Sequence, residues 1–275
     1  MDELRLIGEA DRGALEALLA PDPGKNIYLL GVLDEFGLGG AGRAHAFYGS
    51  PATGALRAVL LVTQTGLWVP EAADPRDVRA FGAGLRTLPL LTSVGDRSLV
   101  DELWIARTGG RRPRLARIQR LLQLTAEEMG PWVTPQLRLA REEELPALVE
   151  ASAQMQLEDL GVDPRSIDEE GHARRCLERI RQSRTWLVAD GGQILFKADV
   201  GATSRHGAQI EGVFTARSCR RQGVATKALG QLSRTLLSSL PRLTLHVDER
   251  NEAALGLYRK LGFAQHREFR LLLAE

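Results

Sequence analysis

The second half of the chain carries the clearest alternation of hydrophobic and polar positions. The run "TWLVADGGQILFKADV", residues 185–200, predicts two strands joined by a Gly-Gly turn, and therefore a hairpin. Residues 208–216 predict a third strand. A helix is then indicated by leucines at helical spacing, namely Leu229, Leu232, Leu236 and Leu240. The order strand, loop, helix indicates an α/β unit.

The remaining elements of this half follow the same patterns. Residues 242–248 predict a strand, and residues 251–263 predict a helix with Asn251 as its N-cap and Gly262 at its end. A closing strand is expected over residues 264–274. Upstream of the hairpin, two more helices are expected over residues 141–160 and 167–182.

The first half is predicted to be mixed. Hydrophobic periodicity indicates helices over residues 26–38 and 74–85, and strands over residues 43–49 and 56–64. A further helical pattern runs from Arg114 to Met129 and stops at Gly130 and Pro131. The letters "GLGGAG", residues 37–42, fit a dinucleotide motif, but the motif needs a preceding buried strand and a following helix, so we interpret them as a turn.

The two halves share a short internal echo. Residues 4–15, "LRLIGEADRGAL", and residues 137–148, "LRLAREEELPAL", have leucines, arginine and alanine in common at an offset of 133. Both read as a short strand followed by a helix, which favours two versions of one unit. We place the seam in residues 127–136 and predict domains 1–131 and 132–275.

Composition narrows the classes of protein. The chain of 275 residues is 44% hydrophobic and 26% charged with a formal net charge of +1, so it has no bulk field to attract nucleic acid. It has no apolar run long enough for a membrane span and no signal-peptide pattern at its start. Cys176 and Cys219 form neither a disulfide framework nor a metal-ligand spacing. We expect a cytoplasmic protein without metal; the oligomeric state is not indicated.

The loop "RRQGVATKAL", residues 220–229, carries the candidate chemistry. It lies between a predicted strand and a predicted helix start, where free backbone N–H groups and the helix dipole favour an anion. Gly223 and Ala225 let a ligand approach the backbone, and Arg220 and Arg221 can bind phosphate. Taken alone, the loop fits a phosphate site and a solvated basic turn equally well.

The surrounding sequence resembles a known family. Arg220, Gly223 and Ala225 match the acyl-CoA motif [Q/R]-x-x-G-x-[G/A] of the GNAT (Gcn5-related N-acetyltransferase) superfamily. Downstream, "LTLHVDERNEAALGLYRKLGF" resembles the family's strand, helix and "LGF" ending, and the resemblance covers about residues 208–265. The second half as a whole is similar to bacterial two-part GNAT proteins whose N-terminal half is GNAT-like.

The resemblance implies a fold class and a cofactor site. The fold is α/β (α+β): tandem GNAT-like folds, each with a mixed, mostly antiparallel central sheet flanked by helices, and with splayed strands in the C-terminal half. Acetyl-CoA is implied as co-substrate. The implied binding residues are Val213, Phe214, Thr215, Arg220, Arg221, Gln222, Gly223, Val224, Ala225, Thr226, Asn251, Ala254 and Tyr258.

The same resemblance implies direct transfer of the acetyl group to a primary amine of a small molecule, peptide or protein. Tyr258 is the implied acid for the leaving thiolate; its alternative is an ordinary core tyrosine. Glu211 is the candidate base, and Glu158, Asp159 and Asp199 are alternatives. Two other functions stay open. One is a non-catalytic acyl-CoA sensor, and the other is transfer of a larger acyl group or transfer to an aminothiol-sugar acceptor.

The first half is expected to lack this chemistry. Moving residues 220–225 back by the offset of 133 gives "TLPLLT", residues 87–92, which has neither glycine nor arginine. We therefore interpret the first half as a degenerate GNAT-like unit without a phosphate loop.

Overall fold

The computed structural model describes residues 4–132, 134 and 136–274. The chain divides into two compact units. The first unit comprises Met1–Leu122, His246–Glu252 and Gln265–Glu275, and the second comprises Gln123–Leu245 and Ala253–Ala264. Segments from the end of the chain thus belong to the first unit. The predicted boundary after residue 131 stays a prediction, and residues 133 and 135 of the expected seam lie outside the described part.

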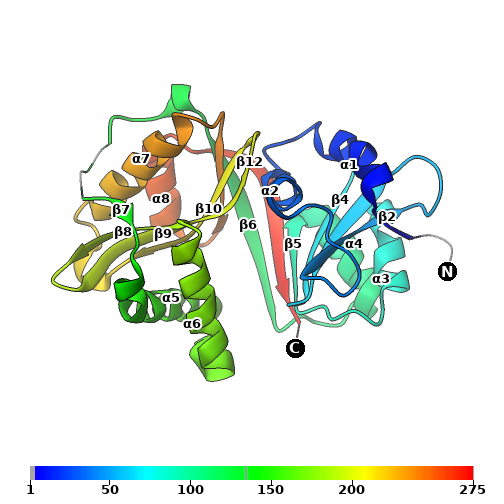
Figure 1. The fold of residues 1–275 in the computed structure, drawn as a ribbon, viewed down its shortest axis with the longest axis horizontal. Coiled ribbons are helices and arrows are strands. Elements are labelled where there is room, and N and C mark those ends of the chain that lie inside the picture. The colour runs from blue at the N-terminus through cyan, green and yellow to red at the C-terminus, as the bar shows by residue number, and fades with distance from the viewer. Residues whose placement is uncertain (1–3, 133, 135, 275) are drawn as a thin grey trace. The chain divides into compact units, whose positions relative to one another are not determined.

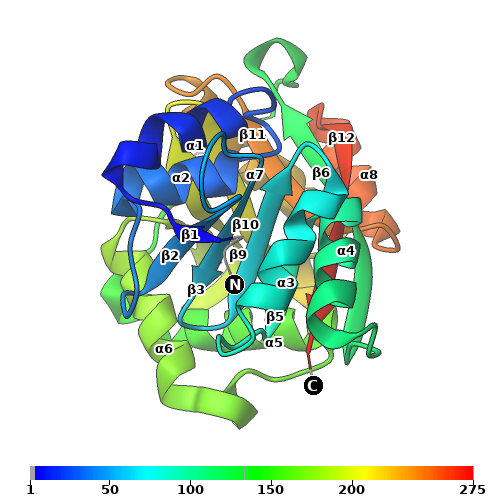
Figure 2. The same ribbon diagram turned by 90° about the vertical axis from the view of Figure 1, so that its right-hand side faces the viewer.

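The first unit is built from strands with helices on both faces of the sheet (Figure 2). Its strand order is β1-β2-β3-β4-β5-β12-β6. The strands are β1 (Arg5–Leu6), β2 (His45–Ser50), β3 (Ala58–Thr63), β4 (Leu67–Ala72), β5 (Thr92–Asp96), β6 (Leu115–Leu124) and β12 (Ala264–Leu273). The helices are α1 (Arg12–Leu19), α2 (Ile27–Phe36), α3 (Arg79–Gly84) and α4 (Arg97–Thr108).

Alternation along β3 explains the two layers of this unit. Val59 and Leu61 pack with residues of α1 and α2, whereas Leu60 packs with residues of α3 and α4. β2, β3 and β4 pair antiparallel, β4 and β5 pair parallel, and β12 pairs antiparallel with β5. The last strand of the chain therefore completes the sheet of the first unit.

The second unit repeats this plan (Figure 1). Its strand order is β7-β8-β9-β10-β11, with β10 and β11 parallel and the other pairs antiparallel. The strands are β7 (Arg138–Leu139), β8 (Thr185–Asp190), β9 (Gln193–Ser204), β10 (Gly207–Thr215) and β11 (Leu243–Asp248). The helices are α5 (Leu145–Leu160), α6 (Arg165–Arg181), α7 (Val224–Leu237) and α8 (Glu252–Leu261). Figure 1 shows α5 and α6 below these strands and α7 and α8 above them.

The internal echo in the sequence corresponds to a repeated structural device. In each unit a two-residue strand leads through a short 3-10 turn into a helix. Arg5 on β1 forms an ion pair with Asp11 over 3.2 Å, and Arg138 on β7 forms one with Glu144 over 2.7 Å. Each acid also accepts a hydrogen bond from the backbone N–H three residues before it. The strand pairings of the two units confirm the mixed, mostly antiparallel fold class.

One predicted element is wrong. The pattern from residue 114 to 129 was expected to be a helix, but it forms β6 and a 3-10 turn, η3 (Ala126–Glu128). Its leucines, arginines and glutamines favour helices in isolation, and pairing within a sheet overrides that preference. The sequence patterns also missed β4, β5 and α4; Pro70 inside β4 hid the strand character of that segment.

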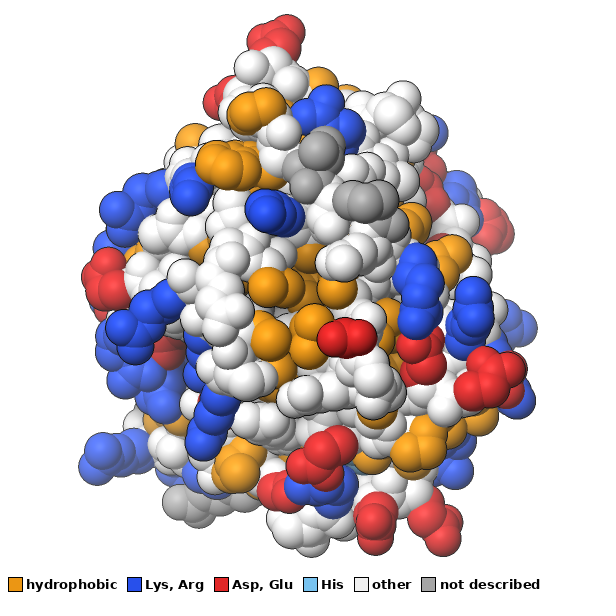
Figure 3. All heavy atoms as spheres, turned by 90° about the vertical axis from the view of Figure 1, so that its left-hand side faces the viewer, with side chains coloured by type: hydrophobic (Ala, Val, Ile, Leu, Met, Phe, Trp, Pro, Cys, Tyr) orange, Lys and Arg blue, Asp and Glu red, His pale blue; other side chains and the backbone are white. Residues whose placement is uncertain are grey.

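The surface and the helices add two observations. The face in Figure 3 has apolar side chains near its centre and mixes Lys and Arg with Asp and Glu around them. Among the helices of the described residues, none combines the length and the apolar character that crossing a membrane requires.

Candidate active site

β10 has a β-bulge where it pairs with β9. Glu211 pairs with Asp199 of β9, but Phe214 pairs with Lys197, so Gly212 and Val213 together stand opposite a single residue. Gly212 has a φ of +59°, a conformation that favours glycine. A Cβ at this position would also collide with Oδ2 of Asp199. The bulge therefore depends on glycine, and Val213 beside it is partly exposed.

The loop after β10 ends in a left-handed glycine at a helix start. β10 is followed by the 3-10 turn η5 (Arg217–Cys219), and Gly223 is the N-cap of the 14-residue helix α7 with a φ of +81°. Beyond its own helix backbone and its chain neighbours, no described residue has an atom within 4 Å of the position where its Cβ would be. Val224, Ala225 and Thr226 form the first turn of α7, so their N–H groups point out of the helix start. This geometry suits an anion such as a pyrophosphate.

Two arginines of the loop are held by one carboxylate. Arg220 donates to Oε2 of Glu158 over 2.7 Å and to the carbonyl of Thr215 over 3.1 Å, while Arg217 donates to Oε1 of Glu158 over 2.9 Å. Burial would raise the pKa of Glu158, but the hydrogen bonds from Arg220 and Arg217 outweigh it and lower that pKa. Glu158 therefore fixes the loop to the end of α5. Gln222 donates to the carbonyl of Ser218 over 2.7 Å.

Tyr258 lies buried on α8 with its ring 5.9 Å from that of Phe263, centroid to centroid. Burial raises the pKa of Tyr258, and the charge of Asp159 raises it further. The phenol therefore stays protonated at neutral pH, which is the form that a proton donor requires. Ala254 lies one turn earlier on α8, and Asn251 directly precedes the helix, as the sequence predicted for an N-cap.

A cluster of charged side chains lies on the α6 side of the bulge. Glu211 accepts a hydrogen bond from Arg179 of α6 over 2.6 Å, and Arg179 also reaches Asp199 over 3.4 Å. Lys197 donates to Asp199 over 2.7 Å, and Thr185 donates to its other oxygen over 2.7 Å. Burial would raise the pKa of Asp199, but the charges of Lys197 and Arg179 lower it overall. The cluster thus brings two acidic and two basic side chains together.

The sequence analysis found part of this cluster and missed part of it. It named Glu211 and Asp199, which the structure brings together through Arg179. It missed Arg179 and Lys197. A lysine inside the apolar strand "ILFKADV" was the available signal, because a buried lysine needs a paired charge. The described residues contain no group of three or more His, Cys, Asp and Glu side chains that could hold a metal ion.

The first unit contains a segment with the same sequence pattern as the loop at Gly223 but with a different structural role. The letters "RAFGAG", residues 79–84, fit the phosphate-loop pattern and follow β4 as the loop of the second unit follows β10. The fixed offset of the sequence comparison missed this match. Here Gly82 lies inside α3, and a Cβ on it would be 2.7 Å from the backbone nitrogen of Arg107 on α4. This glycine serves close helix packing instead of a phosphate loop.

The helix start in the first unit is already capped. Asp74 accepts a hydrogen bond from the N–H of Arg76 over 2.9 Å, and Pro75, which has no N–H, is the first residue of the 3-10 turn η2 (Pro75–Val78). A carboxylate thus lies where an anion would bind. This arrangement agrees with the interpretation of the first half as a degenerate unit.

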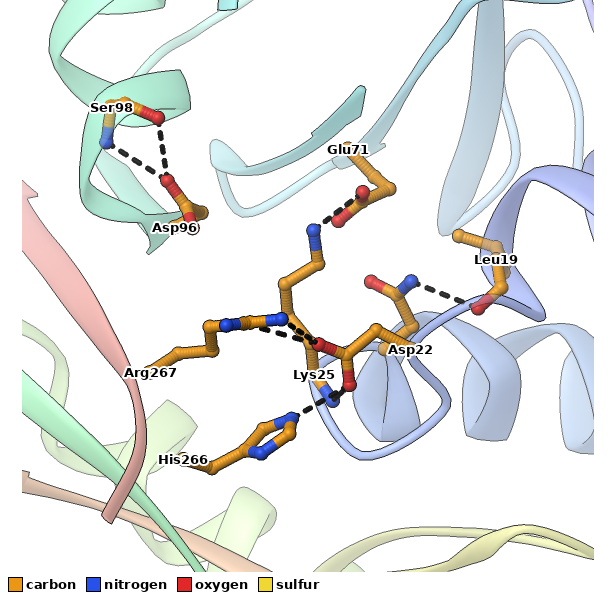
Figure 4. Close-up of polar contacts among 9 residues, drawn as sticks. Leu19, Asp22, Lys25, Glu71, Asp96, Ser98, His266 and Arg267 are labelled. Atoms are coloured by element: carbon orange, nitrogen blue, oxygen red, sulfur yellow. Dashed lines mark hydrogen bonds and ion pairs between the residues drawn. The ribbon is translucent and has the colours of Figure 1, made fainter. Parts of the chain in front are cut away.

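A polar cluster lies at the end of β4 in the first unit (Figure 4). Lys25 donates to the buried Glu71 over 2.7 Å, and Asp22 binds both His266 and Arg267 of β12. Burial raises the pKa of Glu71 to about 7; Lys25 opposes this shift, and Asp96 and Asp22 add to it. Through its bonds to His266 and Arg267, Asp22 anchors the last strand of the chain to the loop before α2.

Comparisons with known proteins agree with this geometry. A Drosophila protein of known structure is 13% identical with a TM-score of 0.69, and the match covers 100% of this chain and 99% of that one. A tandem GNAT protein from the clavulanic acid biosynthesis pathway is 15% identical with a TM-score of 0.57, covering 99% and 98%. An acetyltransferase from the GNAT family of Colwellia psychrerythraea is 12% identical with a TM-score of 0.56, covering 99% of each chain. At these identities the likeness shows the fold. No curated protein matches the chain.

The fold is similar to that of solved GNAT structures. Residues 153–263 match the model of the acetyltransferase (GNAT) family, so this part of the chain is similar to that family. The resemblance found in the sequence is thereby confirmed. Acetyl-CoA is the co-substrate that this family uses in general.

Proposed function

We propose that the protein is an N-acetyltransferase that transfers the acetyl group of acetyl-CoA directly to a primary amine. The observation that carries this proposal is the loop between β10 and α7. Gly223 adopts a left-handed conformation at the start of a long helix, with open space where a side chain would lie. Residues 220–226 bind the pyrophosphate through backbone N–H groups, and Arg220 and Arg221 add charge-assisted hydrogen bonds.

The bulge positions the thioester. Backbone groups of Val213, Phe214 and Thr215 lie beside the pantetheine arm and the acetyl carbonyl. A backbone N–H aimed at that carbonyl oxygen stabilises the negative charge that develops as the amine attacks. Oriented binding of both substrates accounts for a further large part of the rate enhancement.

Two side chains manage the protons. The amine attacks the carbonyl carbon and forms the C–N bond, the C–S bond breaks, and the thiolate of CoA leaves. Tyr258 donates a proton to that thiolate; its phenol is neutral at pH 7, the form that a proton donor requires. Glu211, on the strand just before the bulge, accepts the proton of the attacking amine directly or through water. Asn251 and Ala254 flank the CoA at the start of α8.

An assay of thiol release tests this function. The protein is mixed with acetyl-CoA and a panel of primary amines that includes polyamines, amino acids, aminoglycosides and peptide N-termini. Release of CoA that requires both an amine and the protein supports the proposal, and mass spectrometry of the product identifies the acetylated nitrogen. Tight binding of acetyl-CoA without turnover of any amine would support a non-catalytic acyl-CoA sensor instead. Turnover only with longer acyl-CoAs would point to a larger acyl group.

A further inference from the structure

The charged cluster beside the bulge links the proposed base to a buried ion pair. Glu211 has 31% of its side chain exposed, so it lies at the boundary between solvent and the interior. Its Oε1 accepts a hydrogen bond from Nη2 of Arg179 over 2.6 Å. The other end of the same guanidinium, Nη1, lies 3.4 Å from Oδ2 of Asp199. One arginine therefore spans two carboxylates from neighbouring strands.

The inner part of this cluster, Lys197 and Asp199, is buried and hydrogen-bonded. Asp199 and Lys197 are about 1% exposed, and their ion pair lies directly against Gly212, whose missing side chain makes the room. Thr185 of β8 donates to the second oxygen of Asp199. With both oxygens bound, Asp199 has a fixed orientation, and it fixes Arg179 in turn. A glycine at position 201 leaves space for the carboxylate of Glu211 above β9.

We infer that Arg179 is a positioning residue for the proposed reaction: held by Asp199, it fixes the carboxylate of Glu211 beside the bulge, where the attacking amine releases its proton. This inference rests on the proposed function. Arg179 does not touch the reacting atoms in this scheme and acts through Glu211. A guanidinium is suited to the task because its rigid planar fork can direct separate N–H groups at two carboxylates, whereas a lysine presents one compact charge on a flexible stem.

Charged groups from several parts of the chain lie around Glu211. Arg179 faces it from α6, and Asp199 and Lys197 face it from β9. Arg184, the residue before β8, donates to the carbonyl of Gly201 next to it. In the ion pairs of the cluster, Arg179 and Lys197 face the two acids. Removing Arg179 leaves Glu211 near the negative Asp199 with Lys197 as the compensating charge. An excess of negative charge favours the protonated form of a carboxylic acid.

The test is the pH profile of kcat/KM with an amine substrate and acetyl-CoA. Arg179→Met is expected to lower kcat/KM at pH 7 at least tenfold and to move the acidic limb of the profile upward by about one pH unit or more, since a paired arginine shifts a carboxyl titration by about 1–3 units. Arg179→Lys retains the charge and is expected to keep the limb near the wild-type position while recovering only part of the rate. Glu211→Gln should abolish the acidic limb, and adding Arg179→Met to it should cause little further loss.

Matched controls separate this role from a structural one. Arg181→Met removes another arginine of α6, one that pairs with the exposed Glu142, and should leave the profile unchanged. Acetyl-CoA affinity, measured by calorimetry, should stay within about twofold of wild type in all these variants, because the CoA loop is intact. An active Arg179→Met enzyme with an unshifted acidic limb, or full additivity with Glu211→Gln, overturns the inference alone. A wild-type protein that binds acetyl-CoA and turns over no amine overturns the proposed function, and this inference with it.

Discussion

Lys197 donates a hydrogen bond to Asp199 over 2.7 Å, and only 1% and 2% of the two side chains are exposed. These residues lie two positions apart on β9 and point to the same face of the strand. This buried ion pair has further partners, because Thr185 and Arg179 also bind the carboxylate of Asp199. The pair also lies against Gly212, the glycine of the bulge.

The first prediction concerns this pair. Lys197→Met alone leaves a buried carboxylate without its nearest cation, and Asp199→Leu alone leaves a buried ammonium without its anion. Each single change is expected to lower the free energy of unfolding by about 3–5 kcal/mol, measured by urea denaturation. The double variant Lys197→Met/Asp199→Leu removes both charges and should cost clearly less than the sum of the single changes.

An exposed pair serves as the control. Arg76 and Asp74 form an ion pair in which 76% and 40% of the side chains are exposed, so Arg76→Met should change the free energy of unfolding by less than about 1 kcal/mol. Single and double variants of Lys197 and Asp199 that behave additively would show that the two charges are not coupled.

Much of the second unit was predictable because its signals are local. The hairpin of β8 and β9, the strand β10, and the helices α7 and α8 all appear where their hydrophobic periodicity and glycine turns indicated. The loop at Gly223 was found in the same way. Each of these features depends on residues close together in the chain.

The parts that the sequence concealed depend on distant residues. Arg179 precedes its partner Glu211 by 32 positions, so nothing local to either residue announced their ion pair. The segment "LARIQRLLQL", residues 115–124, has helical leucine spacing and is a strand because it joins a sheet. The letters of "RAFGAG" cannot tell a glycine that packs helix against helix from one that faces a phosphate.

The second prediction concerns Gly223. In Gly223→Val, a branched side chain would disrupt the contacts between the phosphate and the N–H groups at the start of α7. Loss of even two such contacts, at about 1.5–3 kcal/mol each for a charged partner, should weaken acetyl-CoA binding at least tenfold. Gly192→Val is the matched control: Gly192 also has a φ of +81° and open space around it, but it lies in the turn between β8 and β9. Equal affinities in the two folded variants would refute the assignment of the loop.

The third prediction concerns Tyr258. Tyr258→Phe keeps the buried ring and removes the hydroxyl group. Acetyl-CoA affinity should barely change, whereas kcat should fall by about 10²–10⁴, the usual contribution of a positioned general acid. Lower kcat at unchanged affinity marks an interaction made only in the transition state. Full turnover by the Phe variant, under conditions where chemistry limits the rate, would rule out the acid role.

The fourth prediction concerns stoichiometry. The first unit presents a carboxylate, Asp74, and a proline at the helix start that corresponds in chain order to the start of α7. Both features oppose an incoming phosphate, by charge and by the missing donor. Calorimetry should therefore give one acetyl-CoA per chain, and Gly223→Val should abolish or weaken that one binding event. Arg79→Met, which alters "RAFGAG" and the ion pair of Arg79 with Glu102, should leave binding unchanged. A stoichiometry of two would mean that the first unit holds a second site.

The fifth prediction concerns the pH dependence of stability through Glu71. Burial raises the pKa of Glu71 to about 7 in the folded chain, above its ordinary value of 4.5. At pH values between these two, the folded protein holds a proton that the unfolded chain has lost, so the free energy of unfolding falls as the pH rises through this window. Shifts of this size correspond to an effect on the order of 3 kcal/mol, fully present below the unfolded value and lost above pH 7.

The pH dependence due to Glu71 must be separated from that of His246, which has the opposite sign. Burial lowers the pKa of His246 to about 4 from 6.5, so its unfolded form gains a proton first and stability falls as the pH drops through that range.

Urea denaturation at a series of pH values, for wild type and Glu71→Gln, isolates Glu71 as the difference between the two curves. The glutamine carries no charge at any pH, so the variant should gain stability relative to wild type between about pH 4.5 and 7, as the wild type loses its proton. Glu268→Gln, which changes an exposed carboxylate of β12, should give a much flatter difference curve. A flat curve for Glu71→Gln as well would mean that Lys25 stabilises the charged form of Glu71 enough to cancel the effect of burial.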